Sequence, residues 1–223
     1  MKTFDLSTDP LRELNAHLHG EVTAPVAVAN PGGRHAIAVG ATHAHEVTID
    51  GNVGYYCGGM NSDATIRVQG HAGPGLAENM MSGVVHVSGN ASQYCAATAH
   101  GGLVIVDGDA SSRCGISMKG VNIVVKGNVG HMSAFMAQKG ALVVCGDAGD
   151  ALGDSIYEAD LFVAGSVSSL GADCEEKELD AAKQKQLQHL LDLAACDKSI
   201  TDFKCYGSAR RLYHFKVDNA SSY

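Results

Sequence analysis

The sequence carries VHVSGNAS at residues 85–92, VIVDGDAS at 104–111, IVVKGNVG at 123–130 and LVVCGDAG at 142–149. Each stretch begins nineteen residues after the one before it, and the same step continues outward in both directions. One glycine therefore recurs in every repeat: Gly51, Gly70, Gly89, Gly108, Gly127, Gly146 and Gly165. A fixed period of this length is the signature of a solenoid built from stacked structural repeats.

The residues on either side of these repeat glycines follow fixed patterns. The residues two and four positions before each glycine are always aliphatic, and mostly polar or variable residues alternate with them. Such alternation predicts a strand with one buried face. A small polar residue or His follows each glycine directly, and the seventh residue after it is always Gly or Ala. Columns restricted to small residues indicate corners where backbones approach closely or φ is positive.

Nineteen residues with a period of two fit one coil of a parallel β-helix, whereas a helical repeat would need an apolar period near 3.6. We therefore predict an all-β fold in which residues 46–173 form a single-stranded solenoid of about seven 19-residue coils. Coils would stack at the strand spacing of about 4.8 Å. Aliphatic ladders would fill the interior, and stacked Asn and Asp side chains could form hydrogen bonds from coil to coil.

The segments that flank the repeat differ from it. Residues 1–45 predict an N-terminal cap, with a short strand, a cap helix and a degenerate first coil in which Val26 and Val28 precede Gly32, nineteen residues before Gly51. Residues 174–197 begin with charges and continue with a leucine stripe, which predicts a C-terminal helix beside or over the last coil.

Residues 198–223 predict an extended docking tail. This segment is rich in aromatic and basic residues, although the whole chain is acidic. The residues that we expect to bind a partner are Tyr206, Arg210, Arg211, Tyr213 and Phe215. Docking along the chain's own β-helix is the alternative.

Composition limits the functions that are open to the chain. A net charge of −8 and a pI near 5.7 argue against a nucleic acid or an anionic membrane as partner. The sequence has no apolar run of membrane-spanning length and no signal-peptide core, so we expect a cytoplasmic protein. Seven cysteines without a CxxC pair suit a reducing compartment and argue against a disulfide framework and against zinc or iron–sulfur sites.

Patterns that could carry chemistry have simpler structural explanations. The glycines of the GHAGPG stretch (residues 70–75) have the wrong spacing for a dinucleotide loop and are explained as coil corners. Cys57, Cys95 and Cys114 share one column with leucines, which indicates an interior position. The histidines near the repeat occupy scattered columns, whereas metal ligands must converge.

Carboxylates are the remaining candidates. Asp109 and Asp147 share the column after the glycine, where Asn and Ser also occur, and this indicates a corner role. We therefore expect no catalytic, cofactor-binding or metal-binding residues in this chain. A self-contained β-helix enzyme acting on carbohydrates remains an alternative, because paired carboxylates could serve glycoside chemistry.

The repeat resembles the GXGXG family, the C-terminal β-helix of the large subunit of glutamate synthase, over roughly residues 36–172. The signature glycines are matched in four coils by Gly51 and Gly54, Gly70 and Gly73, Gly127 and Gly130, and Gly146 and Gly149. In the other three coils Ser92, Ser111 or Ser168 replaces the second glycine. In its length, its leading Phe4-Asp5-Leu6 and its tail ending Val217-Asp218-Asn219-Ala220, the chain is most similar to the small β-helix subunits of N-methylglutamate synthase.

The resemblance implies a right-handed β-helix and a subunit without catalytic residues. In such complexes the β-helix positions a glutaminase-type amidotransferase subunit and a flavin-binding synthase subunit, and the FMN and iron–sulfur cluster lie in those partners. For N-methylglutamate synthase, a methylamine-glutamate N-methyltransferase, the resemblance implies formation of N-methylglutamate from methylamine and glutamate. The β-helix scaffold of a formylmethanofuran dehydrogenase or transferase complex is the alternative within the family.

Overall fold

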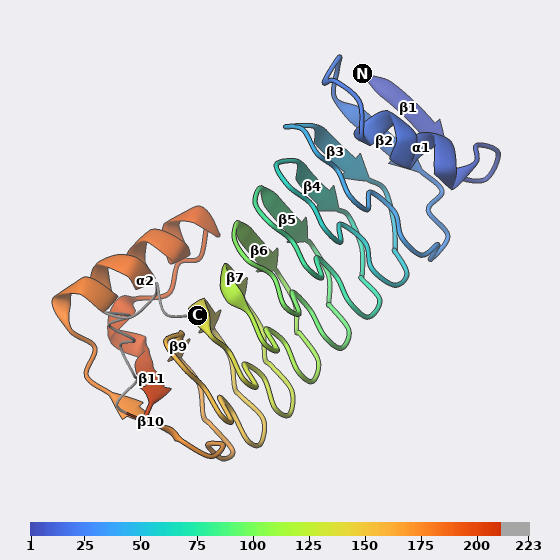
Figure 1. Ribbon diagram of the computed structural model, residues 1–223. Helices are drawn as coiled ribbons and strands as arrows, with labels where there is room; N and C mark the ends of the chain where they lie inside the picture. The colour runs from blue at the N-terminus through green and yellow to red at the C-terminus, as the bar shows by residue number, and fades with distance from the viewer. Residues whose placement is uncertain (211–223) are drawn as a thin grey trace, which may run out of the picture.

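One continuous sheet of eleven strands organises the described part of this computed structural model, residues 1–210 (Figure 1). Its spatial order is β1-β2-β3-β4-β5-β6-β7-β8-β9-β11-β10. The strands are β1 (Lys2–Asp5), β2 (Val26–Ala29), β3 (Glu46–Ile49), β4 (Thr65–Val68), β5 (Val84–Val87), β6 (Leu103–Val106), β7 (Lys119–Val125), β8 (Lys139–Val144), β9 (Asp160–Val163), β10 (Cys174–Lys177) and β11 (Lys204–Ser208). The helices are α1 (Leu11–Leu18), α2 (Ala181–Leu193) and the 3-10 turn η1 (Ile200–Asp202).

Strands β3 to β9 pair in parallel, and each coil contributes one of them. Val47 lies beside Ile66, and Ile66 lies beside Val85, so the nineteen-residue step of the sequence is also the register of the sheet. A second row of parallel bridges runs along the opposite wall from Val53 to Val167. The predicted right-handed parallel β-helix of about seven coils is confirmed.

The interior is a stack of the aliphatic columns. Side chains two and four positions before the repeat glycines are at most 1% exposed in these seven coils, because alternate residues of each strand face inward. The Gly/Ala column marks a tight corner, as predicted: Gly58, Ala77, Ala96, Gly115, Ala134 and Gly153 all have φ between 54° and 69°.

The N-terminal end is closed by α1 and β1. Leu14 and Leu18 of α1 are fully buried, and β1 pairs in parallel with β2. The predicted register of the first coil is wrong at β2, since Val28 pairs with Ile49, twenty-one residues later. The left-handed residues of this coil, Ala36, Ala38 and Gly40, still precede their equivalents Tyr56, Gly58 and Met60 by twenty residues, and the nineteen-residue step holds from Glu46, which pairs with Thr65. The connection between β2 and β3 therefore holds two extra residues, one before Ala36 and one after Gly40.

Helix α2 covers the outward face of the sheet beside β7 to β9 (Figure 1). Its Leu187, Leu190 and Leu191 form a second buried cluster with outward-facing Val124, Val143 and Phe162. The prediction of helix from residue 174 onward is wrong at its start. Residues 174–177 form β10, because they pair with β11 before Asp180 caps α2 by accepting the Lys183 N–H.

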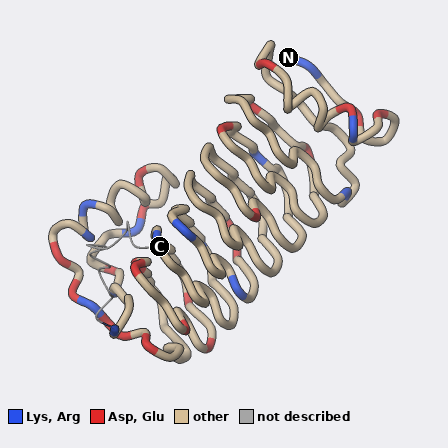
Figure 2. The backbone as a smooth tube through the Cα atoms, in the orientation of Figure 1, with Lys and Arg blue, Asp and Glu red and all other residues tan. Residues whose placement is uncertain are grey.

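Strand β11 closes the C-terminal end of the solenoid. It lies antiparallel between β9 and β10, where the strand of an eighth parallel coil would lie. Charged residues are frequent in the segment that follows the last coil and sparse along the middle coils (Figure 2). A charged outermost strand is a common defence against edge-to-edge association, and Glu175 and Glu176 supply such charges on β10.

Candidate docking surfaces

A ladder of side-chain hydrogen bonds joins successive coils at the corner after each repeat glycine. The Asn90 Oδ1 accepts the backbone N–H of Asp109 at 2.9 Å, and the Asp109 Oδ1 accepts that of Asn128 at 2.7 Å. The same bond recurs on Asn52, His71, Asn128 and Asp147. Asp109 and Asp147, the carboxylates that share this column, are therefore engaged in joining coils.

Six of the seven repeat glycines, all except Gly51, are required by close approach of the backbone. A Cβ on Gly127 would lie 2.3 Å from the Asp109 Oδ1 and 2.8 Å from the Gly108 carbonyl oxygen. Among the seven, Gly51 alone has a φ in the left-handed region. From Gly89 onward the N–H of each repeat glycine donates to the carbonyl of the preceding one at 2.9 to 3.1 Å. A side chain here would separate the coils.

The interior cysteines behave as apolar core residues. Cys57, Cys95 and Cys114 are fully buried in the main core, as their column predicted. Burial raises the pKa of Cys57 to about 12. A hydrogen bond with Cys95, and then burial, raise the pKa of Cys114 well above its ordinary value. Cys57 and Cys114 are therefore protonated, and all three thiols lie out of contact with solvent.

The ionisable groups on the outward face pair with one another. Asp107 lies between His86, whose Nε2 is 2.9 Å from Oδ2, and Lys126, whose Nζ is 2.8 Å from Oδ1. Burial raises the pKa of Asp107, but the hydrogen bonds and charges of Lys126 and His86 outweigh it and hold the pKa below its usual value. Within residues 1–210 no group of three or more His, Cys, Asp or Glu side chains could hold a metal ion.

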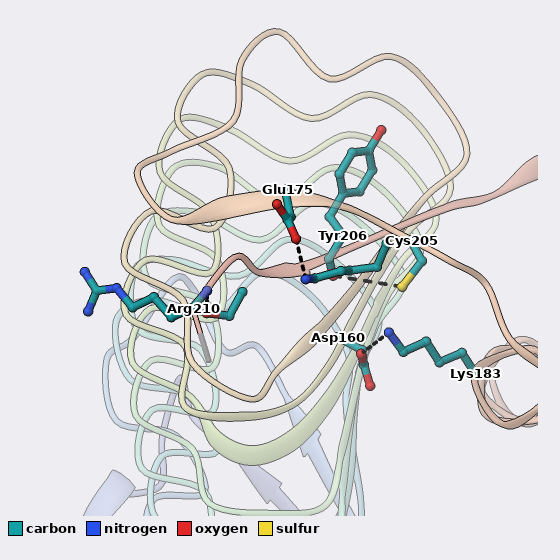
Figure 3. Close-up of polar contacts among 8 residues, drawn as sticks. Asp160, Glu175, Lys183, Cys205, Tyr206 and Arg210 are labelled. Atoms are coloured by element: carbon teal, nitrogen blue, oxygen red, sulfur yellow. Dashed lines mark hydrogen bonds and ion pairs between the residues drawn. The ribbon is translucent and has the colours of Figure 1, made fainter. Parts of the chain in front are cut away.

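The start of the predicted docking tail packs on the chain itself. Tyr206 of β11 belongs to the main buried core and is 6% exposed, so little of its surface is left for the partner contact that the sequence predicted. Figure 3 shows β11 at the end of the stack, together with the ion pair between Asp160 of β9 and Lys183 of α2, 3.3 Å long. Arg210 forms an ion pair with Asp173. Arg211, Tyr213 and Phe215 lie outside the described residues.

One ridge of the solenoid exposes bulky apolar side chains in a strained conformation. The fifth and ninth residues after the repeat glycines have positive φ in the coils from Gly51 to Gly146. Tyr56, Met60 and Met136 occupy such positions with exposures of 51%, 53% and 39%. A left-handed conformation costs a residue with a Cβ roughly 1–2 kcal/mol, and glycine escapes this cost. Gly75 occupies the position of Tyr56 one coil later, which shows that glycine fits there.

We call Tyr56, Met60 and Met136, with half-buried Met132, the strained ridge, and exposed Tyr55 lies next to it in the chain. Tyr55 is 47% exposed and stacks on His35 with ring centroids 4.4 Å apart. Tyr56 and Met60 also line a shallow hollow with Val39 and Glu78. Sequence reasoning missed this surface, because bulky residues conceal a positive φ. The one available signal was that their columns contain Gly, Asn and Ser in other coils.

Comparison with known proteins identifies the family. No protein-family model matches the chain. Over 228 aligned positions the chain is 58% identical to Protein GlxC of Rhizobium meliloti (strain 1021), and the alignment covers the whole of both chains. This protein belongs to the GlxC family. In residues 1–210 of this GlxC-family chain, none of the helices has the length and the hydropathy that a membrane span requires.

Proposed function

We propose that this GlxC-family chain is the non-catalytic scaffold subunit of a glutamate-synthase-like complex. The finer assignment is N-methylglutamate synthase, on the basis of the sequence resemblance. In this role the solenoid holds a glutaminase-type amidotransferase subunit and a flavin-binding synthase subunit in fixed relative positions. The FMN and the iron–sulfur cluster belong to those partner subunits in this proposal.

The strained ridge is the observation that carries the proposal. Glycine at Met60 would relieve the backbone and remove an exposed apolar side chain, so folding alone does not favour methionine there. Residues held in costly conformations cluster at functional sites. Exposed aromatic and methionine side chains are also enriched in protein–protein interfaces. The ridge therefore supports a docking role for this wall of the solenoid.

The stiffness of the coils supports the same role. Coil-to-coil hydrogen bonds run along the sheet, the opposite wall and the polar corner ladder, so neighbouring coils have little freedom to slide. A rod of this kind can hold two proteins at a fixed separation. On the outward face, Asp107 pairs with both His86 and Lys126, and this pairing suits a structural role for the three side chains.

Purification of the native complex tests the proposal. A tagged full-length chain, expressed at its natural level and isolated under mild conditions, should co-elute with an amidotransferase-type chain and a flavoprotein that shows flavin absorbance. Peptide mass spectrometry would identify both, and production of N-methylglutamate from methylamine and glutamate would establish the finer assignment. Elution as an isolated chain would refute the scaffold role, and formylmethanofuran-type partners would place the chain in the other subgroup.

A further inference from the structure

Two cysteines outside the main core face each other between the solenoid and its C-terminal helix. Cys145 directly follows β8 on the outward face of the sheet, and Cys196 lies three residues beyond the end of α2. Their Sγ atoms are 3.4 Å apart. Cys145 belongs to the second buried cluster, which includes Phe162 of β9 and Leu190 of α2, and partly buried Cys196 packs against this cluster. This apolar cluster fixes the two chain segments against each other.

The turn after α2 aims Cys196 at the sheet. Ala195 has a φ of 48°, in the left-handed region, and the Cys196 N–H donates to the Leu191 carbonyl at 2.9 Å. The reversal turns Cys196 back toward Cys145. A disulfide has an S–S length of about 2.05 Å, so closure requires an approach of about 1.4 Å. Side-chain rotation and a small shift of this exposed turn can supply that approach.

We propose that Cys145 and Cys196 form a reversible oxidation site that fastens α2 to the wall of the solenoid. The oxidant is a low-molecular-weight disulfide such as oxidised glutathione. The Cys196 thiolate attacks one of its sulfurs, forms a mixed disulfide and releases one thiolate. The Cys145 thiolate then attacks the Cys196 sulfur and releases the second. The two protein thiols lose two electrons, and the two departing thiolates take up the protons.

Exposure sets the order of these two steps. Cys196 is partly exposed, whereas Cys145 is 4% exposed. Burial, and then the hydrogen bond with Cys196, raise the pKa of Cys145 to about 12, although Lys198 and Lys126 act in the opposite direction. Cys196 is therefore the thiol that an external disulfide reaches first. Cys145 resolves the mixed disulfide, and the low thiolate fraction makes this step slow.

The cross-link would stabilise the C-terminal cap. It would join residues 51 positions apart in the sequence. It would also restrain the segment that leads from α2 to β11, the strand that closes the solenoid. Disulfides that close loops of this size stabilise mainly by restricting the unfolded chain. Cys95 and Cys114 provide a contrast, because they also interact but are fully buried, where a small disulfide cannot reach them.

Oxidation of the full-length protein tests this site. Incubation with oxidised glutathione should lower the thiol count of the denatured protein from seven to five. Peptide mapping without reductant should find one linked pair, Cys145 with Cys196. The melting temperature should rise by about 5–10 °C, the shift expected for a disulfide in a chain of this size. Reduction with dithiothreitol should restore the starting value.

Variants separate the site from general thiol oxidation. Cys196→Ser and Cys145→Ala should each abolish the linked pair and the rise in melting temperature. Cys205→Ser, which removes another cysteine of the same cluster, should retain both. Seven free thiols after oxidation, a linkage between other cysteines, or a linked pair without a rise in melting temperature would each overturn the proposal. Because Cys196 is partly exposed, its serine variant tests the site even if the Cys145 variant unfolds.

Discussion

The Asp147 carboxylate joins its coil to the next one through two bonds to a single residue, Ser166. Its Oδ1 accepts the Ser166 backbone N–H at 2.7 Å and the Ser166 hydroxyl at 2.9 Å. These two bonds lower the pKa of Asp147 below its usual value of 3.8, the backbone bond having the larger effect. A pKa lowered in the folded state links the stability of this coil junction to pH.

Asp147→Asn should reduce the loss of stability in acid. The lowered pKa means that Asp147 stabilises the fold at pH values above 3.8, the value expected in the unfolded chain. This contribution disappears as pH falls through the folded-state pKa. Asparagine keeps an acceptor oxygen that does not titrate, as Asn128 does one coil earlier. Urea midpoints between pH 6 and 2 would measure the difference, and equal acid sensitivity of the two proteins would contradict it.

His71→Asn should leave the fold as stable as the wild type, whereas His71→Ala should weaken it. The His71 Nδ1 accepts the Asn90 backbone N–H at 2.9 Å, where the other rungs of the ladder use carbonyl or carboxylate oxygens. Asparagine restores an oxygen acceptor, and alanine loses one hydrogen bond worth about 0.5–1.5 kcal/mol. Thermal melts measure both variants. This bond also requires the proton on Nε2, which ¹⁵N shifts of the imidazole would reveal.

Gly127→Ala should destabilise the solenoid strongly. Its Cβ would overlap the Asp109 Oδ1 and the Gly108 carbonyl, and both belong to the coil-to-coil ladder. Overpacking of this kind costs about 1–3 kcal/mol, so the melting temperature should fall by about 3–10 °C. Gly207→Ala is the matched control, because its Cβ would meet its nearest neighbour at an ordinary 3.5 Å. Similar melting temperatures for the two variants would contradict the role of close approach.

Leu191→Ala should loosen the C-terminal cap. Leu191 is fully buried in the cluster between α2 and the outward face of the sheet. Truncating a buried leucine costs about 2–5 kcal/mol. Leu193→Ala on the same helix is the control, because that side chain is 50% exposed. Hydrogen exchange of the α2 amides should accelerate in the first variant only. Unchanged exchange in Leu191→Ala would mean that α2 is held by other contacts.

The repeat predicted the solenoid because its two requirements recur in every coil. Val106 must face the interior and Gly108 must lie against the preceding coil, so both columns are restricted in the sequence and visible without a structure. The same reasoning predicted the hydrogen-bond ladder of Asn90 and Asp109, which the structure confirms.

Features that occur once or tolerate several residue types escaped sequence analysis. The antiparallel pairing of Tyr206 with Leu161 has no period, so β11 was predicted only as part of a tail. The two extra residues in the first coil lie at two places between β2 and β3, outside the paired strands, so they leave the strand pattern of the sequence unchanged. The positive φ at Met60 could not be predicted, because a bulky residue occupies this position. The neighbouring corner at Gly58 could be predicted, because its column contains only Gly and Ala.

Met60→Gly should separate the stability of the solenoid from its assembly. Met60 has a φ of 55° and is 53% exposed, so glycine relieves the backbone and removes little packing. We expect a melting temperature equal to or slightly above that of the wild type, because relief of the left-handed strain offsets the added freedom of the unfolded chain. Retention of partner chains during purification should fall. Ser117→Gly, at the same position three coils later, where φ is 52°, is the control for the backbone change alone. A Met60→Gly protein that melts well below the wild type, or that keeps its partners at wild-type yield, would show that this methionine serves folding and not docking.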